Sequence, residues 1–330
     1  MKALHITFFV FSVAIVIMSG LYLYYIYVPK VEEPSLSGNY ERSAIRVDGQ
    51  DRTFSTYIPK DLKQSAAMVF VLHGSRGTGD RIRRATAYEF DLLADRYGFL
   101  VIYPDGFEKH WNDCRGSADY LANTENIDDP AFFQQMINTL VETNKTNRDE
   151  VFVTGLSNGG HMAYRLALEI PEQFSAVAAM AANLPVDSVL DCKKSNQPIS
   201  VAIFNGTTDP LNPYEGGLVS LLGNDTRGVV MSANATVDYW RETAGITSDP
   251  ARIDHAETDQ NSKTSVTQSR WLGIDGTDVR LYTLNGSGHV VPSKIAKFPR
   301  LLGGDAGDIS GPEETILFFF GLDRTEATGN

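Results

Sequence analysis

A serine enclosed by glycines is the clearest chemical signal in the sequence. Ser157 lies in the G-x-S-x-G pattern Gly155-Leu156-Ser157-Asn158-Gly159. Residues 150–155 (EVFVTG) predict a buried strand directly before it, and residues 158–168 predict a helix directly after it. In that setting the glycines permit a tight, strained turn that exposes the serine hydroxyl. The pattern predicts that Ser157 is a nucleophile, with a plain glycine-rich turn as the alternative.

A serine hydroxyl is a poor nucleophile unless a base removes its proton. Of the six histidines, His289 fits this role best, because it lies in the tight loop NGSGHVVP after a predicted strand and near the end of the domain. His255 also follows Ser157 but lies in a polar connection. We therefore expect His289 to be the base, the alternative being an exposed loop histidine.

The third member of a serine triad is an acid that orients the histidine and stabilises its charged form. In α/β-hydrolases the order along the chain is nucleophile, acid, histidine. Asp209 in IFNGTTDPLNPYEGG follows a predicted strand and has the right place in that order. Asp187 and Asp191 are weaker alternatives because they follow the preceding strand. Asp209 could instead only form an Asx turn before Pro210.

A second glycine-rich loop, LHGSRGTG at residues 72–79, follows the first buried strand. Its position is that of the loop that supplies one amide of an oxyanion hole. We expect the backbone N–H groups of Ser75 and Asn158 to face the negative charge that develops during acyl transfer. A phosphate-binding loop is the alternative, but the G-K-[ST] ending of such loops is missing.

These motifs depend on strands that end at one edge of a sheet, where open α/β sheets bind their ligands. The apolar runs that predict buried strands are 67–74, 99–106, 150–155, 174–185 and 199–210. They alternate with helical patterns, which predicts an α/β domain with a mostly parallel central sheet and helices on both faces. A hairpin around Asp48-Gly49 adds antiparallel strands at one edge. We expect one catalytic domain at 42–323 and a polar tail at 324–330.

The N-terminal segment has a different composition. After a short flank at residues 1–5, residues 6–28 are uncharged and largely apolar, which predicts a transmembrane signal anchor, followed by a linker at 29–41. A cleaved signal peptide is the alternative, although its apolar core is normally shorter. We expect the catalytic domain to lie outside the cytoplasm, anchored to the membrane, or secreted if the segment is cleaved.

Charge and cysteine content narrow the choice of partner and compartment. The net charge is −12, and no cluster of Lys and Arg is present, so we expect no nucleic-acid partner. The two cysteines, Cys114 and Cys192, could pair in an exported protein or remain free thiols. No metal or cofactor motif is apparent, and we expect neither.

Seven motifs in a fixed order resemble the polyhydroxybutyrate depolymerase and feruloyl-esterase-like family of secreted α/β-hydrolases. They are LHGSRGTG, WNDCRG, NIDDPAFF, TGLSNGGHMAYRLA, NGTTDPLNPYEGG, SANATVDYW and NGSGHVVP. The resemblance covers roughly residues 42–323. It implies the α/β-hydrolase fold and carboxylic-ester hydrolysis through a serine acyl-enzyme without metal or cofactor. The family's catalytic positions match Ser157, Asp209 and His289.

The sequence departs from the family pattern at three positions. Val291 stands where the family often has a tryptophan beside the substrate. Cys114 lies within WNDCRG, which favours a disulfide with Cys192. His161 replaces an apolar residue after the glycines, and we expect it to be a helix-start residue and not a second base.

Four side chains follow strands closely enough to be candidates for substrate binding: Trp111, Asn112, Arg115 and Arg76. The alternatives are that Trp111 packs its loop and that Arg76 is solvated. The expected substrates are short-chain esters, hydroxyalkanoate oligomers and feruloyl or acetyl esters, with small or oligomeric esters favoured over a solid polymer. An acyltransferase on the same fold and a non-catalytic binding module are the alternative functions.

Overall fold

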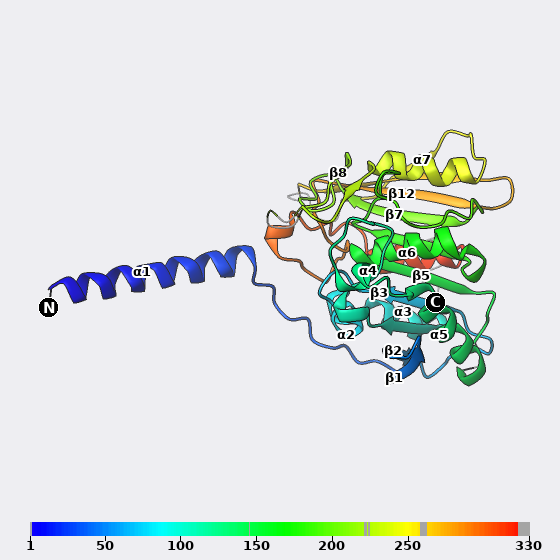
Figure 1. Ribbon diagram of the computed structural model, residues 1–330, viewed down its shortest axis with the longest axis horizontal. Helices are drawn as coiled ribbons and strands as arrows, with labels where there is room; N and C mark the ends of the chain where they lie inside the picture. Colours follow the sequence, from blue (N-terminus) through cyan, green and yellow to red (C-terminus); the bar gives the residue numbers. More distant parts are fainter. Residues whose placement is uncertain (1, 145, 221–222, 224, 258–262, 323–330) are drawn as a thin grey trace.

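Ten strands form the central sheet of the protein in a computed structural model that describes residues 2–144, 146–220, 223, 225–257 and 263–322. Their order is β1-β2-β4-β3-β5-β6-β7-β12-β11-β10 (Figure 1). The strands are β1 (Asn39–Val47), β2 (Gln50–Ile58), β3 (Met68–Leu72), β4 (Leu100–Pro104), β5 (Val151–Leu156), β6 (Ala176–Met180), β7 (Ser200–Gly206), β10 (Ala251–Asp254), β11 (Ser265–Leu272) and β12 (Asp278–Asn285). A separate small sheet pairs β8 (Gly217–Leu218) with β9 (Val229–Val230). The expected tail at 324–330 lies outside the described residues.

The strands from β4 across to β12 run parallel, as predicted. Their side chains alternate between two apolar cores, because successive residues of a strand point to opposite faces. Along β3, Met68, Phe70 and Leu72 enter the core on one face, and Val69 and Val71 enter the core on the other. A strand buried on both faces has no polar side, which is why these strands read as continuous apolar runs.

Helices cover both faces of the sheet (Figure 1). They are α2 (Gly79–Ala85), α3 (Glu89–Tyr97), α4 (Leu121–Thr124), α5 (Asp129–Asn144), α6 (Asn158–Glu169), α7 (Ala233–Thr243) and α8 (Gly311–Phe319), with 3₁₀ turns η1 (Phe107–Lys109), η2 (Pro171–Gln173) and η3 (Arg300–Leu302). Leu166 of α6 and Trp240 of α7 lie in one core, whereas Phe90 of α3 and Ile316 of α8 lie in the other. The two-faced arrangement predicted from the sequence is confirmed.

The edges of the sheet are antiparallel. The predicted hairpin joins β1 to β2 through Asp48 and Gly49, both of which have positive φ, at 48° and 80°. At the other edge β11 pairs with β12 and β10 pairs with β11. Strand β10 forms inside the polar connection that leads to His255, and all of its residues are exposed.

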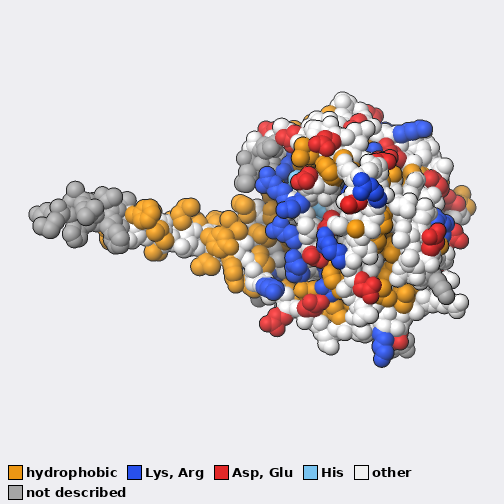
Figure 2. Space-filling view, turned by 60° about the horizontal axis from the view of Figure 1, so that its bottom comes forward, with side chains coloured by type: hydrophobic (Ala, Val, Ile, Leu, Met, Phe, Trp, Pro, Cys, Tyr) orange, Lys and Arg blue, Asp and Glu red, His pale blue; other side chains and the backbone are white. Residues whose placement is uncertain are grey.

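Helix α1 (Lys2–Tyr25) extends away from the domain, and Figure 2 shows hydrophobic side chains along it. Tyr24 packs under Arg300, whose guanidinium lies 4.4 Å from the ring centre. Within the residues that the structure describes, no helix is both long enough and apolar enough to cross a bilayer. The predicted transmembrane helix at 6–28 is therefore not supported, and the helix ends at Tyr25, before the predicted Val28.

The predicted linker at 29–41 lies against the domain. Glu33 forms an ion pair with Arg83 of α2, and the Ser37 hydroxyl donates a hydrogen bond to Asp95 of α3 at 2.6 Å. Strand β1 begins at Asn39, so the sheet starts slightly before the predicted domain boundary at 42.

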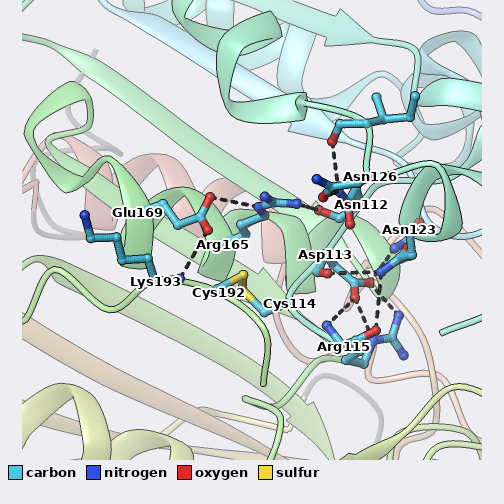
Figure 3. The surroundings of a disulfide bond; sticks show 12 residues. Asn112, Asp113, Cys114, Arg115, Asn123, Asn126, Arg165, Glu169, Cys192 and Lys193 are labelled. Atoms are coloured by element: carbon cyan, nitrogen blue, oxygen red, sulfur yellow. Dashed lines mark hydrogen bonds and ion pairs between the residues drawn. A yellow bond between two sulfur atoms is a disulfide. The ribbon is translucent and has the colours of Figure 1, made fainter. Parts of the chain in front are cut away.

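A disulfide joins Cys114, in the loop after β4, to Cys192, in the segment after β6 (Figure 3). The two segments also pair through backbone hydrogen bonds from Gly116 to Val189 and from Asp191 to Cys114. Two side chains of α6 bind both arms. Arg165 donates to the Asn112 carbonyl at 2.6 Å, and Glu169 accepts from the Lys193 N–H at 3.2 Å. The disulfide therefore reinforces a junction that hydrogen bonds already form.

Replacing Cys114 and Cys192 together by alanine should lower the free energy of unfolding by about 2–4 kcal/mol, because the bridge restricts the unfolded chain across 78 residues of separation. Urea unfolding of the wild type and of the double variant, followed by circular dichroism, measures this difference. Equal transition midpoints in the two proteins would contradict the expectation.

Candidate active site

The predicted nucleophile lies at a strained turn between β5 and α6. Ser157 has φ 57° and ψ −118°, a conformation that costs energy for any residue other than glycine. A Cβ atom at Gly155 would lie 2.4 Å from the Gly159 carbonyl, and one at Gly159 would lie 2.6 Å from the His73 carbonyl. Both glycines are therefore steric requirements of the turn, as the motif predicted.

Asp209 and His289 lie together after neighbouring parallel strands, β7 and β12. The His289 Nδ1–H donates to Asp209 Oδ2 at 2.7 Å, and both side chains are buried. The other carboxylate oxygen of Asp209 accepts the backbone N–H groups of Leu211 and Asn212 at 2.7 and 2.9 Å. The carboxylate is thus fixed in place and accepts from Nδ1, so a neutral imidazole bonded in this way has its lone pair on Nε2, as a general base requires.

The loop that carries His289 is held by close backbone packing. A Cβ at Gly288 would lie 1.9 Å from the Leu302 carbonyl, which accepts the His289 N–H at 2.7 Å. Beyond the histidine, Ser293 donates to the carboxylate of Glu89 in α3, and Ser310 donates to the same carboxylate. Burial raises the pKa of Glu89. These two hydrogen bonds connect the segment after His289 to α3.

Ser157 and His289 follow different strands of the sheet, β5 and β12. No hydrogen bond links the Ser157 hydroxyl to His289 among the described residues. His161 lies near both residues, since its Nδ1–H donates to the Ser157 carbonyl at 2.9 Å and the charge of His289 helps to lower its pKa. Catalytic hydrogen bonds are often long in unliganded enzymes and shorten when the substrate binds.

The loop after β3 lies against the turn that carries the serine. A Cβ at Gly74 would lie 3.4 Å from the Ser157 Cβ. The next N–H, that of Ser75, and the N–H of Asn158 donate to no acceptor in the described part of the chain. Two backbone donors close to a nucleophile, neither with an acceptor among the described residues, are what an oxyanion hole needs.

The side chain of Asn158 has a role that the sequence did not indicate. Its Oδ1 accepts the Trp111 N–H at 2.8 Å, and its Nδ2 donates to the Trp111 carbonyl at 3.1 Å and to Asp113 Oδ2 at 2.5 Å. Asp113 in turn forms a bidentate ion pair with Arg115, with distances of 3.0 and 2.6 Å. This buried network attaches the WNDCRG loop to the first residue of α6.

Three of the four predicted substrate-binding side chains are buried within the protein, which corrects the expectation that they face a substrate. Trp111 is fully buried, and its Nε1–H donates to the His73 carbonyl. Asn112 bonds to the Ile127 carbonyl, and Arg115 bonds to Asp113. Their hydrogen-bonding groups are used by the fold, and Trp111 packs its loop.

Arg76, the fourth candidate, is exposed and has a positive φ of 60°. Its backbone is fixed on both sides, since its N–H donates to the Lys109 carbonyl and its carbonyl accepts from Arg81. Its guanidinium has no acidic partner among the described residues. It therefore remains available beside the predicted oxyanion loop.

His161 is buried in the first turn of α6, where it was expected to be a helix-start residue. Its Nδ1–H donates to the Ser157 carbonyl, and its Nε2 is buried without a hydrogen-bond partner in the described chain. Burial, together with the positive charge of Arg115, lowers its pKa to about 3. A neutral imidazole without access to solvent supports the turn and does not compete with His289 as a base.

The described residues contain no group of three or more His, Cys, Asp or Glu side chains that could hold a metal ion.

Sequence comparison identifies a family for most of the domain. The sequence model of the family described as "Esterase PHB depolymerase" matches residues 53–241, more than half of the chain. This range includes Ser157 and Asp209 and ends before His289.

Two curated relatives show how far the similarity extends. "Putative esterase NocK" from Nocardia uniformis subsp. tsuyamanensis is 24% identical over 306 residues, which are 89% of this chain and 87% of that protein. Feruloyl esterase B from Neurospora crassa is 32% identical over 125 residues, which are 38% of this chain and only 41% of that enzyme. The chain thus spans less than half of the feruloyl esterase.

A solved structure supports the same fold. The acetyl xylan esterase from Aspergillus awamori superimposes with a TM-score of 0.53 at 17% identity, over 85% of this chain and 99% of that one. At this level of identity the likeness concerns the fold alone.

His161 should make the stability of the protein fall in acid. Its folded pKa of about 3 is below the usual 6.5, so the unfolded chain binds a proton more readily. The folded state therefore keeps its full stability with respect to His161 above about pH 6.5, where the histidine is neutral in both states. That stability decreases as the pH falls, because the unfolded chain then binds a proton that the folded protein does not. Between about pH 6.5 and 4.5 the wild type should lose about 2 kcal/mol more unfolding free energy than His161→Met.

Urea unfolding of both proteins at several pH values measures this difference. His73, whose pKa burial lowers to about 4, and the buried carboxylates are common to both proteins, so their effects cancel. Parallel stability curves for the two proteins would show that His161 does not carry the depressed pKa.

Proposed function

The chain belongs to the esterase PHB depolymerase family and is a carboxylic-ester hydrolase, and on this premise we propose that Ser157, His289 and Asp209 form its catalytic triad. The hydrogen bond of 2.7 Å between His289 Nδ1 and Asp209 is the observation that carries the proposal. It aligns a base at the carboxyl edge of the sheet where the strained turn presents Ser157.

In the first half of the reaction, the Ser157 Oγ attacks the ester carbonyl carbon while His289 Nε2 accepts the serine proton. The oxyanion that forms is stabilised by the N–H groups of Ser75 and Asn158. The C–O bond to the alcohol then breaks, and His289 donates its proton to the departing oxygen. Asp209 stabilises the positively charged imidazole throughout.

In the second half, water attacks the acyl-enzyme. His289 accepts a proton from the water molecule, a second tetrahedral intermediate forms in the same oxyanion hole, and the bond between the acyl carbon and Ser157 Oγ breaks. The proton returns to Ser157, and the carboxylic acid leaves as its anion at neutral pH.

We infer that the substrates are esters of small or oligomeric aliphatic acids, including hydroxyalkanoate oligomers. Trp111 is buried under His73, and Val291, at the position where a tryptophan was expected from the family resemblance, is buried as well. Neither position offers an exposed aromatic surface on which a feruloyl ring could stack. Acetyl esters fall within this class, whereas feruloyl esters, suggested by the name of one relative, rank lower in this proposal.

We further propose that the domain acts outside the cytoplasm. The support is the Cys114–Cys192 disulfide, since such bridges persist in oxidising compartments. Attachment to a membrane through residues 6–28 stays a prediction from the sequence alone.

Ser157→Ala should lower kcat for 4-nitrophenyl butyrate by about 10³-fold or more, because the covalent step is lost. Asp209→Asn should lower it by about 10²–10⁴-fold, because the imidazole loses the acceptor that fixes its tautomer. Asp187→Asn is the matched control, since Asp187 is exposed and pairs only with Lys194. Initial rates followed by release of nitrophenol measure all three, and undiminished turnover by Ser157→Ala would refute the proposed nucleophile.

The methyl ester of the hydroxybutyrate dimer should be hydrolysed with a kcat/KM at least about 10-fold above that for methyl ferulate, because no exposed tryptophan is available to bind the aromatic acid. Chromatography of the released acids, with acetylated xylan as a third substrate, gives the comparison. A preference for methyl ferulate would refute the proposed substrate class.

A further inference from the structure

Arg227 is a buried cation that has no acidic partner among the described residues. Its side chain is 8% exposed, and its Nε is buried with no hydrogen-bond acceptor in the described part of the chain. Its guanidinium donates no hydrogen bond and forms no ion pair with the described residues. A buried charge is costly unless it is compensated, so a guanidinium left in this state is suited to an anion that arrives from outside.

The acids near Arg227 do not compensate it. Asp113 is buried in its own bidentate pair with Arg115. Asp119 and Asp225, which are close along the chain, are exposed and form no ion pair with Arg227. The carbonyl of Arg227 accepts from Arg115 Nη1 at 3.3 Å, which fixes its backbone in the same network.

A second cation, Arg76, lies near the aromatic pair that Arg227 contacts. The Arg227 guanidinium lies over the ring of Tyr120, 5.4 Å from its centre, and His110 stacks on the same ring at 4.4 Å. Both Arg227 and the exposed Arg76 lie close enough to His110 for their charges to lower its pKa. Two guanidiniums that have no acidic partner in the described part of the chain thus lie near one aromatic pair, although the chain carries a net charge of −12.

Tyr120, the ring that Arg227 covers, also contacts the proposed oxyanion hole. The Tyr120 hydroxyl accepts a hydrogen bond from the Ser75 hydroxyl at 3.4 Å. Ser75 supplies one of the two proposed oxyanion donors, so a single side chain, that of Tyr120, separates Arg227 from the loop at which the ester carbonyl binds.

We propose that Arg227, assisted by Arg76, forms a subsite for a carboxylate of the substrate. The proposal rests on the ester hydrolysis proposed above and defines its substrate class as esters that also carry a free carboxylate, such as hydroxyalkanoate oligomers with an acid end. A guanidinium binds a carboxylate through two parallel hydrogen bonds, and burial strengthens both. Neutral esters react at the same serine but leave the subsite empty.

The test compares the hydroxybutyrate dimer, which has a free carboxylate at neutral pH, with its methyl ester. For the wild type, kcat/KM should be at least about 10-fold higher for the free dimer, since a hydrogen bond to a charged group that is made in a buried site is worth about 10- to 100-fold. Arg227→Gln should remove this preference and change kcat/KM for the methyl ester by less than about 3-fold. Release of hydroxybutyrate, measured by chromatography, follows both reactions.

Two further variants separate binding from folding. Arg227→Lys keeps the charge and should retain part of the preference, whereas a purely structural role would make both substitutions slow the two substrates equally. Arg252→Gln removes one exposed charge from edge strand β10 and should behave like the wild type.

Equal rates of the wild type on dimer and methyl ester, or an Arg227→Gln variant that slows both or neither, would overturn the subsite. If the wild type hydrolyses 4-nitrophenyl butyrate in that case, ester hydrolysis at Ser157 still holds. Absence of turnover of 4-nitrophenyl butyrate would instead count against the proposed function itself.

Discussion

The strained backbone at Ser157 is the constraint on which the rest of the site depends. A φ of 57° at a non-glycine residue is unfavourable, so the surrounding structure has to hold it. The end of β3 comes so close that only Gly159 fits against the His73 carbonyl, and the His161 side chain bonds to the Ser157 carbonyl from the helix side. The parallel sheet supplies the rigid support, and the turn supplies the exposed hydroxyl.

Around that turn, buried polar contacts connect segments that are distant in the sequence. Asp113 binds Asn158 and Arg115, so one carboxylate joins the start of α6 to the loop after β4. The disulfide then joins this loop to the segment after β6. Each contact lies on the side of the sheet where the parallel strands end, and that side therefore contains both the chemistry and much of the polar framework that fixes it.

The sequence was sufficient to predict those parts of the molecule that short stretches of residues determine. Apolar runs predicted the parallel strands, and the fixed setting of G-x-S-x-G predicted the turn at Ser157. The likeness to the polyhydroxybutyrate depolymerase and feruloyl-esterase group is confirmed by the family match over residues 53–241. Asp209 and His289 could be paired from the order nucleophile, acid, histidine along the chain. In the structure they follow the neighbouring strands β7 and β12.

What the sequence could not provide is the direction of a side chain within a loop. Trp111 and Arg115 follow a strand end, as substrate-binding residues do, yet both point into the protein. The His73 carbonyl accepts the Trp111 indole N–H there, and Asp113 pairs with Arg115. Nothing in the sequence pointed to Arg227 as a binding residue. Only the fold shows that its guanidinium is buried with no acidic partner among the described residues. The apolar N-terminal segment predicted a helix, but composition alone did not determine where that helix ends.

The backbone and the side chain of Asn158 have different roles. Its backbone N–H faces the proposed oxyanion, and its side chain holds Trp111 and Asp113. Every residue except proline has the N–H, but few side chains can accept and donate at such short range while fully buried. In this protein the second variable position of G-x-S-x-G is therefore constrained by its side chain as well as by its backbone, and a substitution there would require a matching change in the loop after β4.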